Sequence, residues 1–177
     1  MLLDEDVKIY RNEEPPLEIQ SDGELSAAAF LHHKENGNLN KCKELGQLLA
    51  KTFEDDAKRL EKDPHASQKL SLISYIVSDE LASEIPDVML QKSALSVFQN
   101  TIEAMNPALF SAISDSTAYT LYILDDRQGD EGSMGHTFAE LCGDENNQQL
   151  IESANMLAVE YRRLFHSIIT SYSFIPI

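Results

Sequence analysis

The residue types that could do chemistry gather in the second half of the chain, beginning with Asp115. It is the single charged residue between Met105 and Leu124. A carboxyl group enclosed by such an apolar run has a raised pKa and could act as an acid, a base or a ligand. Buried acids are also held in purely structural hydrogen-bond networks, for example with Ser111, and an Asp that faces solvent needs no function. The sequence favours these structural explanations and keeps Asp115 as a catalytic candidate.

The segment from 125 to 135 combines acidic residues with glycines. Carboxylate oxygens on a flexible loop suit a hard cation such as calcium, but the alternating ligands and final Glu of an EF-hand are absent. We therefore favour no metal, and keep four carboxylates as metal candidates: Asp125, Asp126, Asp130 and Glu131. His136 follows directly and is the histidine to test first as a catalytic residue. Its structural alternative is a surface residue at the start of a helix.

The sequence contains none of the common catalytic motifs. HExxH, GxSxG, the P-loop and Cys–His zinc spacings are all absent. Asp79 and Glu80 are adjacent carboxylates after an apolar helical run, where a solvated face explains them better than acid–base chemistry does. Cys42 and Cys142 have no CxxC partner and are expected to be reduced, buried thiols. No cofactor is expected.

The net charge of −16 in 177 residues limits the classes of partner. Nucleic acid and anionic membrane surfaces are disfavoured, because both require Lys and Arg to meet phosphate groups. The first 20 residues lack the basic start and apolar core of a signal peptide, and no run is apolar enough to span a bilayer. The sequence therefore predicts an acidic cytoplasmic protein that binds neither nucleic acid nor membrane.

The near-chargeless run after Asn106 predicts a central helix over about 107–124. Asn106 can cap this helix, and Pro107 suits its first turn. A helix with so little polar face is buried on most sides, so we expect amphipathic helices around it. Helical spacing or capping residues indicate six further segments: about 21–36, 38–62, 66–82, 86–105, 136–141 and 147–172.

These elements predict an all-α fold. We expect a single-domain bundle of about six to seven helices over 21–177, around the buried central helix. Residues 1–20 precede it as an extended acidic arm or tail, because Pro15 and Pro16 favour extended backbone. The alternatives are a strap that docks on the bundle or on a neighbouring subunit and a mobile tail.

Two further expectations concern helix ends. His32 and His33 end the first helix, where cations complement the helix dipole. Asp144 or Asn146 is expected to cap the last helix, since short polar side chains accept hydrogen bonds from the first turn.

The sequence favours a non-enzymatic interaction or regulatory domain that binds a protein partner, which could be a second copy of itself. The last helix has a wide apolar stripe, and the chain ends in apolar residues that would form a hydrophobic patch if exposed. We therefore expect this end to pack on the bundle or across a dimer. The expected interface residues are Tyr172, Phe174, Ile175 and Ile177. One alternative is a small enzyme or metal-dependent binder that uses carboxylates and histidine near the 125–136 loop. Another is a ligand sensor with a small molecule in the bundle core.

Overall fold

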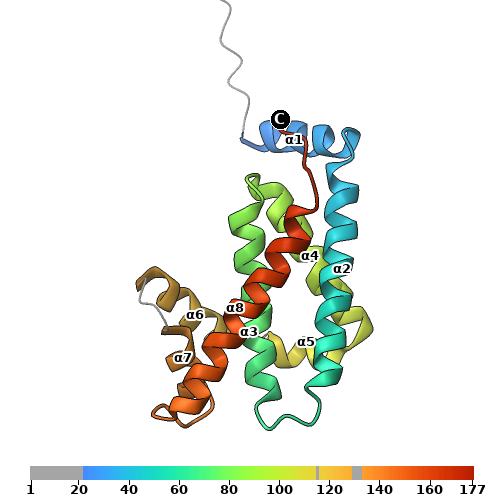
Figure 1. Ribbon diagram of the computed structural model, residues 1–177. Helices are drawn as coiled ribbons and strands as arrows, with labels where there is room; N and C mark the ends of the chain where they lie inside the picture. The colour runs from blue at the N-terminus through green and yellow to red at the C-terminus, as the bar shows by residue number, and fades with distance from the viewer. Residues whose placement is uncertain (1–21, 115, 129–132) are drawn as a thin grey trace, which may run out of the picture.

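The computed structural model describes residues 22–114, 116–128 and 133–177, and over these residues the chain is all helical (Figure 1). The predicted all-α class is confirmed, although the described residues form eight helices where six to seven are expected. The predicted arm over 1–20 lies outside the described residues. The helices are α1 (Asp22–Glu35), α2 (Asn38–Arg59), α3 (Ala66–Glu84), α4 (Val88–Met105), α5 (Pro107–Ile113), α6 (Ser116–Gln128), α7 (Ser133–Leu141) and α8 (Gln148–Thr170).

Helix α3 is the element around which the others are arranged. It contacts α2, α4, α5, α6, α7 and α8. Leu72 and Ile73 point into the core from one turn of α3, and Ile76 and Val77 do so from the next, all without solvent exposure. An apolar surface this wide must be covered from several sides, so the neighbouring helices pack around α3.

The predicted central helix over 107–124 is wrong as a single element, because the segment breaks into α5 and α6. Asn106 and Pro107 begin α5 as expected, with the Asn106 side chain accepting a hydrogen bond from the Leu109 amide. At its other end the Ser114 hydroxyl donates to the Phe110 carbonyl oxygen. Short polar side chains compete in this way for backbone hydrogen bonds, and the run Ser114–Asp115–Ser116 therefore favours a helix end over helix continuation.

The two halves of that segment lie at the side of the bundle. α5 contacts α3 and α4, whereas α6 contacts α3 and α7. Tyr122 and Ala118 on α6 are buried, but Tyr119 and Leu124 are more than two-fifths exposed. The sequence pattern was apolar enough for a core helix, yet the helix break gives each half only one buried face.

The predicted cap of the last helix is wrong by one residue or more. Asn147 is the N-cap, and its side-chain oxygen accepts a hydrogen bond from the Leu150 amide. Asp144 and Asn146, the predicted caps, precede it in the turn. In Figure 1, α8 crosses in front of α3. The residues that follow α8 then run to the end of the bundle where α1 lies.

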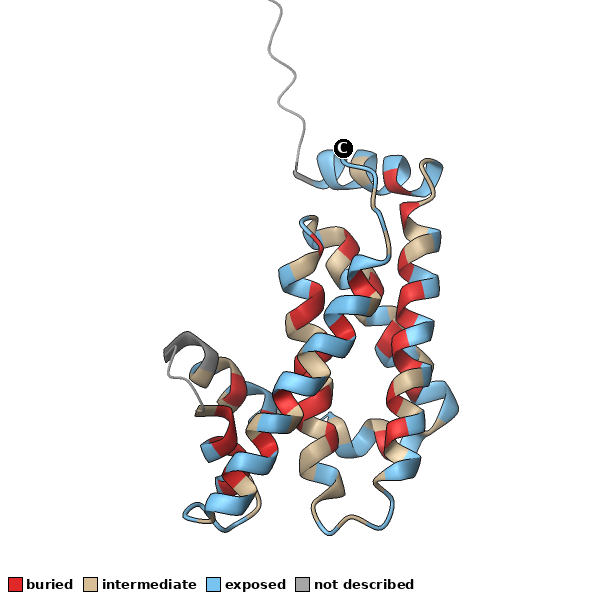
Figure 2. Cartoon of the chain, viewed as in Figure 1, coloured by how far each residue is buried: buried red, intermediate tan, exposed pale blue. Residues whose placement is uncertain are grey.

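Helix α1 lies across one end of the bundle and packs on α2 (Figures 1 and 2). Its apolar residues Leu25, Phe30 and Leu31 are about half exposed. Among the described helices, none is long and apolar enough to cross a bilayer.

Candidate functional site

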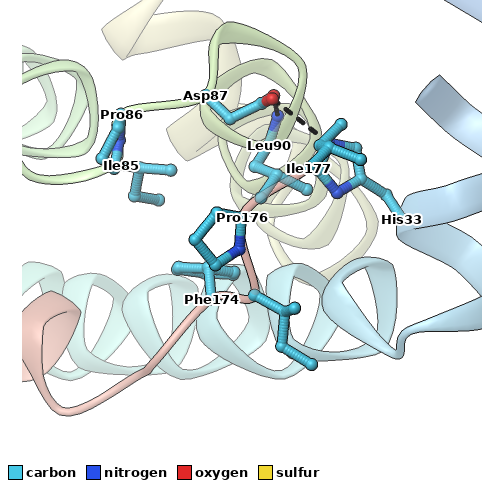
Figure 3. A pocket seen from close by; sticks show the side chains of 9 residues that line it. His33, Ile85, Pro86, Asp87, Leu90, Phe174, Pro176 and Ile177 are labelled. Atoms are coloured by element: carbon cyan, nitrogen blue, oxygen red, sulfur yellow. Dashed lines mark hydrogen bonds and ion pairs between the residues drawn. The ribbon is translucent and has the colours of Figure 1, made fainter.

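A cavity of about 260 Å³ lies where three distant segments of the chain meet (Figure 3). The end of α1 supplies His33, and the connection from α3 into α4 supplies Ile85, Pro86 and Asp87. The third wall is the C-terminal tail, which we define as residues 171–177. The cavity is lined mostly by apolar side chains, with one polar corner at His33 and Asp87.

Both ring nitrogens of His33 have partners, and the residue is only 1% exposed. Nε2 lies 3.2 Å from Asp87 Oδ2, and Nδ1 lies 3.0 Å from Asn38 Nδ2. An amide nitrogen can only donate, so Nδ1 must accept and Nε2 must carry the proton. The network thus holds His33 as the neutral Nε2–H tautomer.

The orientation of Asn38 is itself fixed by the C-terminal tail. Its Nδ2 donates to the Ile175 carbonyl oxygen at 2.8 Å, and its Oδ1 accepts from the Ile175 amide at 2.9 Å. Rotating the amide by half a turn would break both bonds. The tail, Asn38, His33 and Asp87 therefore form one hydrogen-bonded chain that spans the whole sequence.

Asp87 is also the N-cap of α4. Its Oδ1 accepts from the amides of Met89 and Leu90 at 2.8 and 3.0 Å. Desolvation acts to raise the pKa of Asp87, but the hydrogen bonds from Leu90, His33 and Met89 outweigh it and leave the pKa below its usual value. Asp87 is thus an ionised anchor for both α4 and His33.

This arrangement suits binding or structural fixation better than catalysis. A general base needs a free ring nitrogen within reach of its substrate, and both nitrogens of His33 are occupied. The cavity could accept a small apolar group between Leu90, Pro86 and Phe174. Its size is close to the lower limit of small-molecule sites.

A second polar cluster lies between α3 and α8. Arg162 Nη1 bonds to Asp79 Oδ2 and lies 3.1 Å from Glu80 Oε1. One turn further along, His166 Nδ1 lies 3.1 Å from Glu84 Oε1. Glu80 is buried, so the expectation that it lies on a solvated face is wrong. An arginine from another helix compensates this carboxylate, and the sequence gives no sign of that pairing.

Of the six predicted catalytic and metal candidates, the structure describes the side chains of Asp125 and His136 alone. Asp115, Asp130 and Glu131 lie outside the described residues. Asp125 on α6 accepts a hydrogen bond from Thr137 on α7, which ties these two helices together. His136, the neighbour of Thr137, is exposed, as its structural alternative predicts. Asp126 belongs to α6.

The predicted interface residues divide into two pairs. Tyr172 and Phe174 are partly buried and pack against the core of their own chain. Ile175 and Ile177 are about half exposed or more. The tail is therefore attached to its own bundle, and Ile175 and Ile177 are the residues that remain available to a partner.

Two further apolar surfaces lie away from this cavity. One is an open groove of about 690 Å³ between α1, α2 and α4, lined by residues such as Phe30, Leu39 and Val88. The other is the outward face of α8, which carries Met156, Val159 and Leu164. Amphipathic patterns predict which helices have a buried stripe, but they do not predict which apolar residues are left uncovered.

No family model matches this chain, and neither the curated proteins nor the solved structures include one with significant similarity to it.

Proposed function

We propose that this chain is a protein-interaction domain that pairs with a second copy of itself through the outward face of α8. The observation that supports this proposal is a group of apolar side chains on that face. Met156 is 73% exposed and Val159 is 59% exposed, and Leu164, five residues after Val159, is 39% exposed. Single exposed apolar residues are ordinary, but a contiguous patch on one helix is typical of an interaction surface.

The patch is continuous along the helix. Seven residues line one shallow depression of the surface at spacings of three and four: Asn155, Met156, Val159, Glu160, Arg163, Leu164 and Ser167. Residues at this spacing lie on one face of a helix, so a second helix can lie along them. The charged residues Glu160 and Arg163 are placed between the apolar ones.

The sequence of this face is complementary to itself in the antiparallel direction. In a twofold-symmetric pair, residue i of one copy meets residue j of the other, and j meets i. An axis midway between Glu160 and Arg163 brings Glu160 of one copy to Arg163 of the other, twice. The same axis places Val159 of one copy level with Leu164 of the other, on the two flanks of the charged pairs. Opposite charges thus meet at the centre while apolar side chains flank them, which favours a second copy as the partner.

The affinity expected for such a pair is modest. The described contact involves one helix from each copy, and small interfaces of this kind give dissociation constants on the order of micromolar or weaker. The two Glu–Arg pairs lie next to the twofold axis, and because such charged pairs add little net affinity they mainly fix the orientation of the two copies. The proposal therefore predicts a monomer–dimer equilibrium that depends on concentration.

Sedimentation velocity over a concentration series tests the proposal. Val159→Glu places a charge in the apolar part of the face and should shift the protein to monomer. Arg163→Glu should do the same by setting two acidic pairs against each other. The double variant Glu160→Arg with Arg163→Glu exchanges the charges and should restore the dimer.

The matched control is Leu31→Glu, at an equally exposed apolar position on α1. This variant should leave the equilibrium unchanged. The proposal fails if the wild-type protein remains monomeric at about 100 µM. It also fails if Leu31→Glu, rather than Val159→Glu, disrupts the dimer, because the groove beside α1 would then be the interface.

A further inference from the structure

Three metal-ligating side chains converge where α3 packs against α8. Among the described residues, Glu80, Glu84 and His166 place their ligand atoms within 4.8 Å of one another. We propose that these three residues bind a divalent transition-metal ion such as Zn²⁺ or Mn²⁺. This site is separate from the 125–136 loop, from the cavity at the C-terminal tail and from the apolar face of α8.

The helices supply the geometry. Glu80 and Glu84 are four residues apart on α3, so both side chains leave the helix on the same face. His166 approaches that face from α8, with Nδ1 3.1 Å from Glu84 Oε1. Ligand atoms about 2.0–2.2 Å from a shared zinc ion are roughly 3–4 Å apart, so this pair already has the required separation. The ligand atom of Glu80 lies within 4.8 Å of the other two and has to move closer to join them.

The three ligands range from buried to exposed, which suits a metal site that keeps one coordination position open to solvent. Glu80 lies at the base of the cluster and is only 7% exposed. Glu84 is intermediate and His166 is exposed at the rim. A metal held by three protein ligands keeps a fourth position for water or for a ligand, and here that position faces solvent.

The charges around the cluster match a divalent cation. Arg162 is bonded to both Asp79 and Glu80, and its single positive charge compensates one carboxylate. Counted without the histidine, the three carboxylates and one guanidinium leave a net charge of about −2. A divalent ion would bring this partly buried cluster to neutrality, which removes the cost of leaving carboxylates close together.

Arg162 also has a role that is compatible with metal binding. It contacts Oε1 of Glu80, and a carboxylate has a second oxygen that can bind the ion. Ligating carboxylates are commonly held by hydrogen bonds from a second layer of residues. Because Asp79 anchors the same guanidinium, Arg162 remains in place while Glu80 turns toward the metal.

The donor atoms select the class of metal. One imidazole nitrogen with two carboxylates suits zinc, manganese or ferrous iron. Calcium prefers six to eight oxygen ligands, and magnesium prefers an octahedral set of oxygens and water. We therefore expect Zn²⁺ to bind more tightly than Mg²⁺ or Ca²⁺.

Calorimetric titration of metal-free protein with ZnCl₂ tests the proposal, with MgCl₂ as the comparison. The expected result is one zinc per chain. His166→Ala and Glu84→Gln should each weaken zinc binding by roughly tenfold or more. Titration with Co²⁺ gives a second readout, because visible absorption bands of a low-symmetry site should appear in the wild type and be lost in both variants.

Two variants serve as controls. His136→Ala removes an exposed histidine on α7, and Glu152→Gln removes an exposed carboxylate on α8. Both should bind zinc as the wild type does. Circular dichroism establishes that each variant is folded, and Glu84→Gln is nearly isosteric, so it keeps the test decisive if His166→Ala misfolds.

The proposal is overturned if the wild type shows no saturable zinc binding at sub-millimolar concentration. It is also overturned if folded His166→Ala and Glu84→Gln proteins both bind zinc with wild-type affinity, because the ion would then lie elsewhere. Binding by the Val159→Glu variant should equal that of the wild type. Metal binding and self-association can therefore fail independently.

Discussion

The side chain of Asn38 pairs with both backbone groups of Ile175, from a position 137 residues earlier in the chain. A strand partner would make the same two bonds with its own backbone. Here an amide side chain at the start of α2 makes them instead, and the same amide donates to His33. The attachment of the tail and the protonation state of the histidine thus depend on one residue.

Asn38→Ala should release the C-terminal tail. The substitution removes both bonds to Ile175 and leaves His33 Nδ1 without its donor in a buried position. Because buried polar groups are left without partners, the substitution should lower the free energy of unfolding by about 2–3 kcal/mol. Urea denaturation measures the loss, and hydrogen exchange of the C-terminal peptide should show faster exchange at the Ile175 amide. Asn100→Ala, which removes an exposed amide on α4, is the control. Unchanged exchange at Ile175 would contradict this role of Asn38.

Asp87→Asn should make stability less dependent on pH in the acid range. The pKa of Asp87 is held below its usual value, so its stabilising effect is complete above about pH 4 and is lost as the pH falls through the folded pKa. Asparagine still caps a helix well, so the variant mainly loses the charge on the bond to His33. At pH 7 we expect a loss of about 1 kcal/mol, because solvent partly screens Asp87.

The measurement for Asp87 is the free energy of unfolding of both proteins across the acid range. The difference between wild type and Asp87→Asn should shrink as the pH falls below about 4. Asp55→Asn, on an exposed position of α2, should follow the wild type throughout. A difference that stays constant with pH would mean that the carboxylate charge of Asp87 has no part in stability.

Cys42 should be almost unreactive in the folded protein. Burial, with a smaller contribution from Asp87, raises the pKa of its thiol to about 11, and its Sγ donates to the Leu90 carbonyl oxygen. The thiolate is the reactive species, so little of it exists at pH 8. Ellman's reagent should label Cys42 only after unfolding. Cys42→Ser is the comparison that assigns the slow thiol, and rapid labelling of two thiols in native protein would be incompatible with this burial.

The positions of most helices can be predicted from the sequence, because capping residues and apolar spacing act over a few neighbouring residues. Asn106 and Pro107 predict the start of α5 correctly, and the apolar spacing predicts α2, α3, α4 and α8 to within a few residues. The break after Ser114 was missed because apolar content outweighed the helix-ending tendency of Ser, Asp and Ser. Hydrophobic content indicates burial, but the backbone preferences of three polar residues decided where the helix ends.

The polar sites depend on contacts between distant positions, which periodicity does not reveal. His33 has the pattern of a helix-end cation, yet its partner Asp87 lies 54 residues away. Glu80 follows an apolar run and is predicted to lie on a solvated face, and His166 belongs to a different helix. They meet because α3 packs against α8, and only the packing of these two helices brings them together. The one sequence signal was the four-residue spacing of Glu80 and Glu84.

Gly46→Ala should destabilise the protein although alanine favours helices. Gly46 lies in α2 against α4, and an added Cβ would come within 2.7 Å of both the Ala94 carbonyl oxygen and the Val97 Cβ. Relief requires the two helices to move apart, at about 1–3 kcal/mol, which exceeds the gain of about 1 kcal/mol in helix propensity. Thermal unfolding measures the net effect. Lys51→Ala, at an exposed position of the same helix, should change little. A stabilised Gly46→Ala protein would mean that α2 and α4 are less closely packed.

Tyr122→Phe should stabilise the protein. Tyr122 has no solvent exposure, and its hydroxyl has no hydrogen-bond partner among the residues that the structure describes. Burial raises the pKa of this phenol, which reflects the same low-polarity surroundings. A buried hydroxyl without a partner carries a desolvation cost, so its removal should gain about 1 kcal/mol and raise the Tm by roughly 2–4 °C. The aromatic contact with Tyr75, at 5.4 Å between ring centres, is retained.

Tyr119→Phe is the matched control for Tyr122→Phe, three residues earlier on the same helix. Its hydroxyl lies 3.1 Å from Ser78 Oγ in an exposed position. Removing it deletes a hydrogen bond that water can replace, so the Tm should stay constant or fall slightly. Opposite signs for the two substitutions are the expected result of differential scanning calorimetry. A lower Tm for Tyr122→Phe would show that the buried hydroxyl does have a partner, such as an internal water molecule.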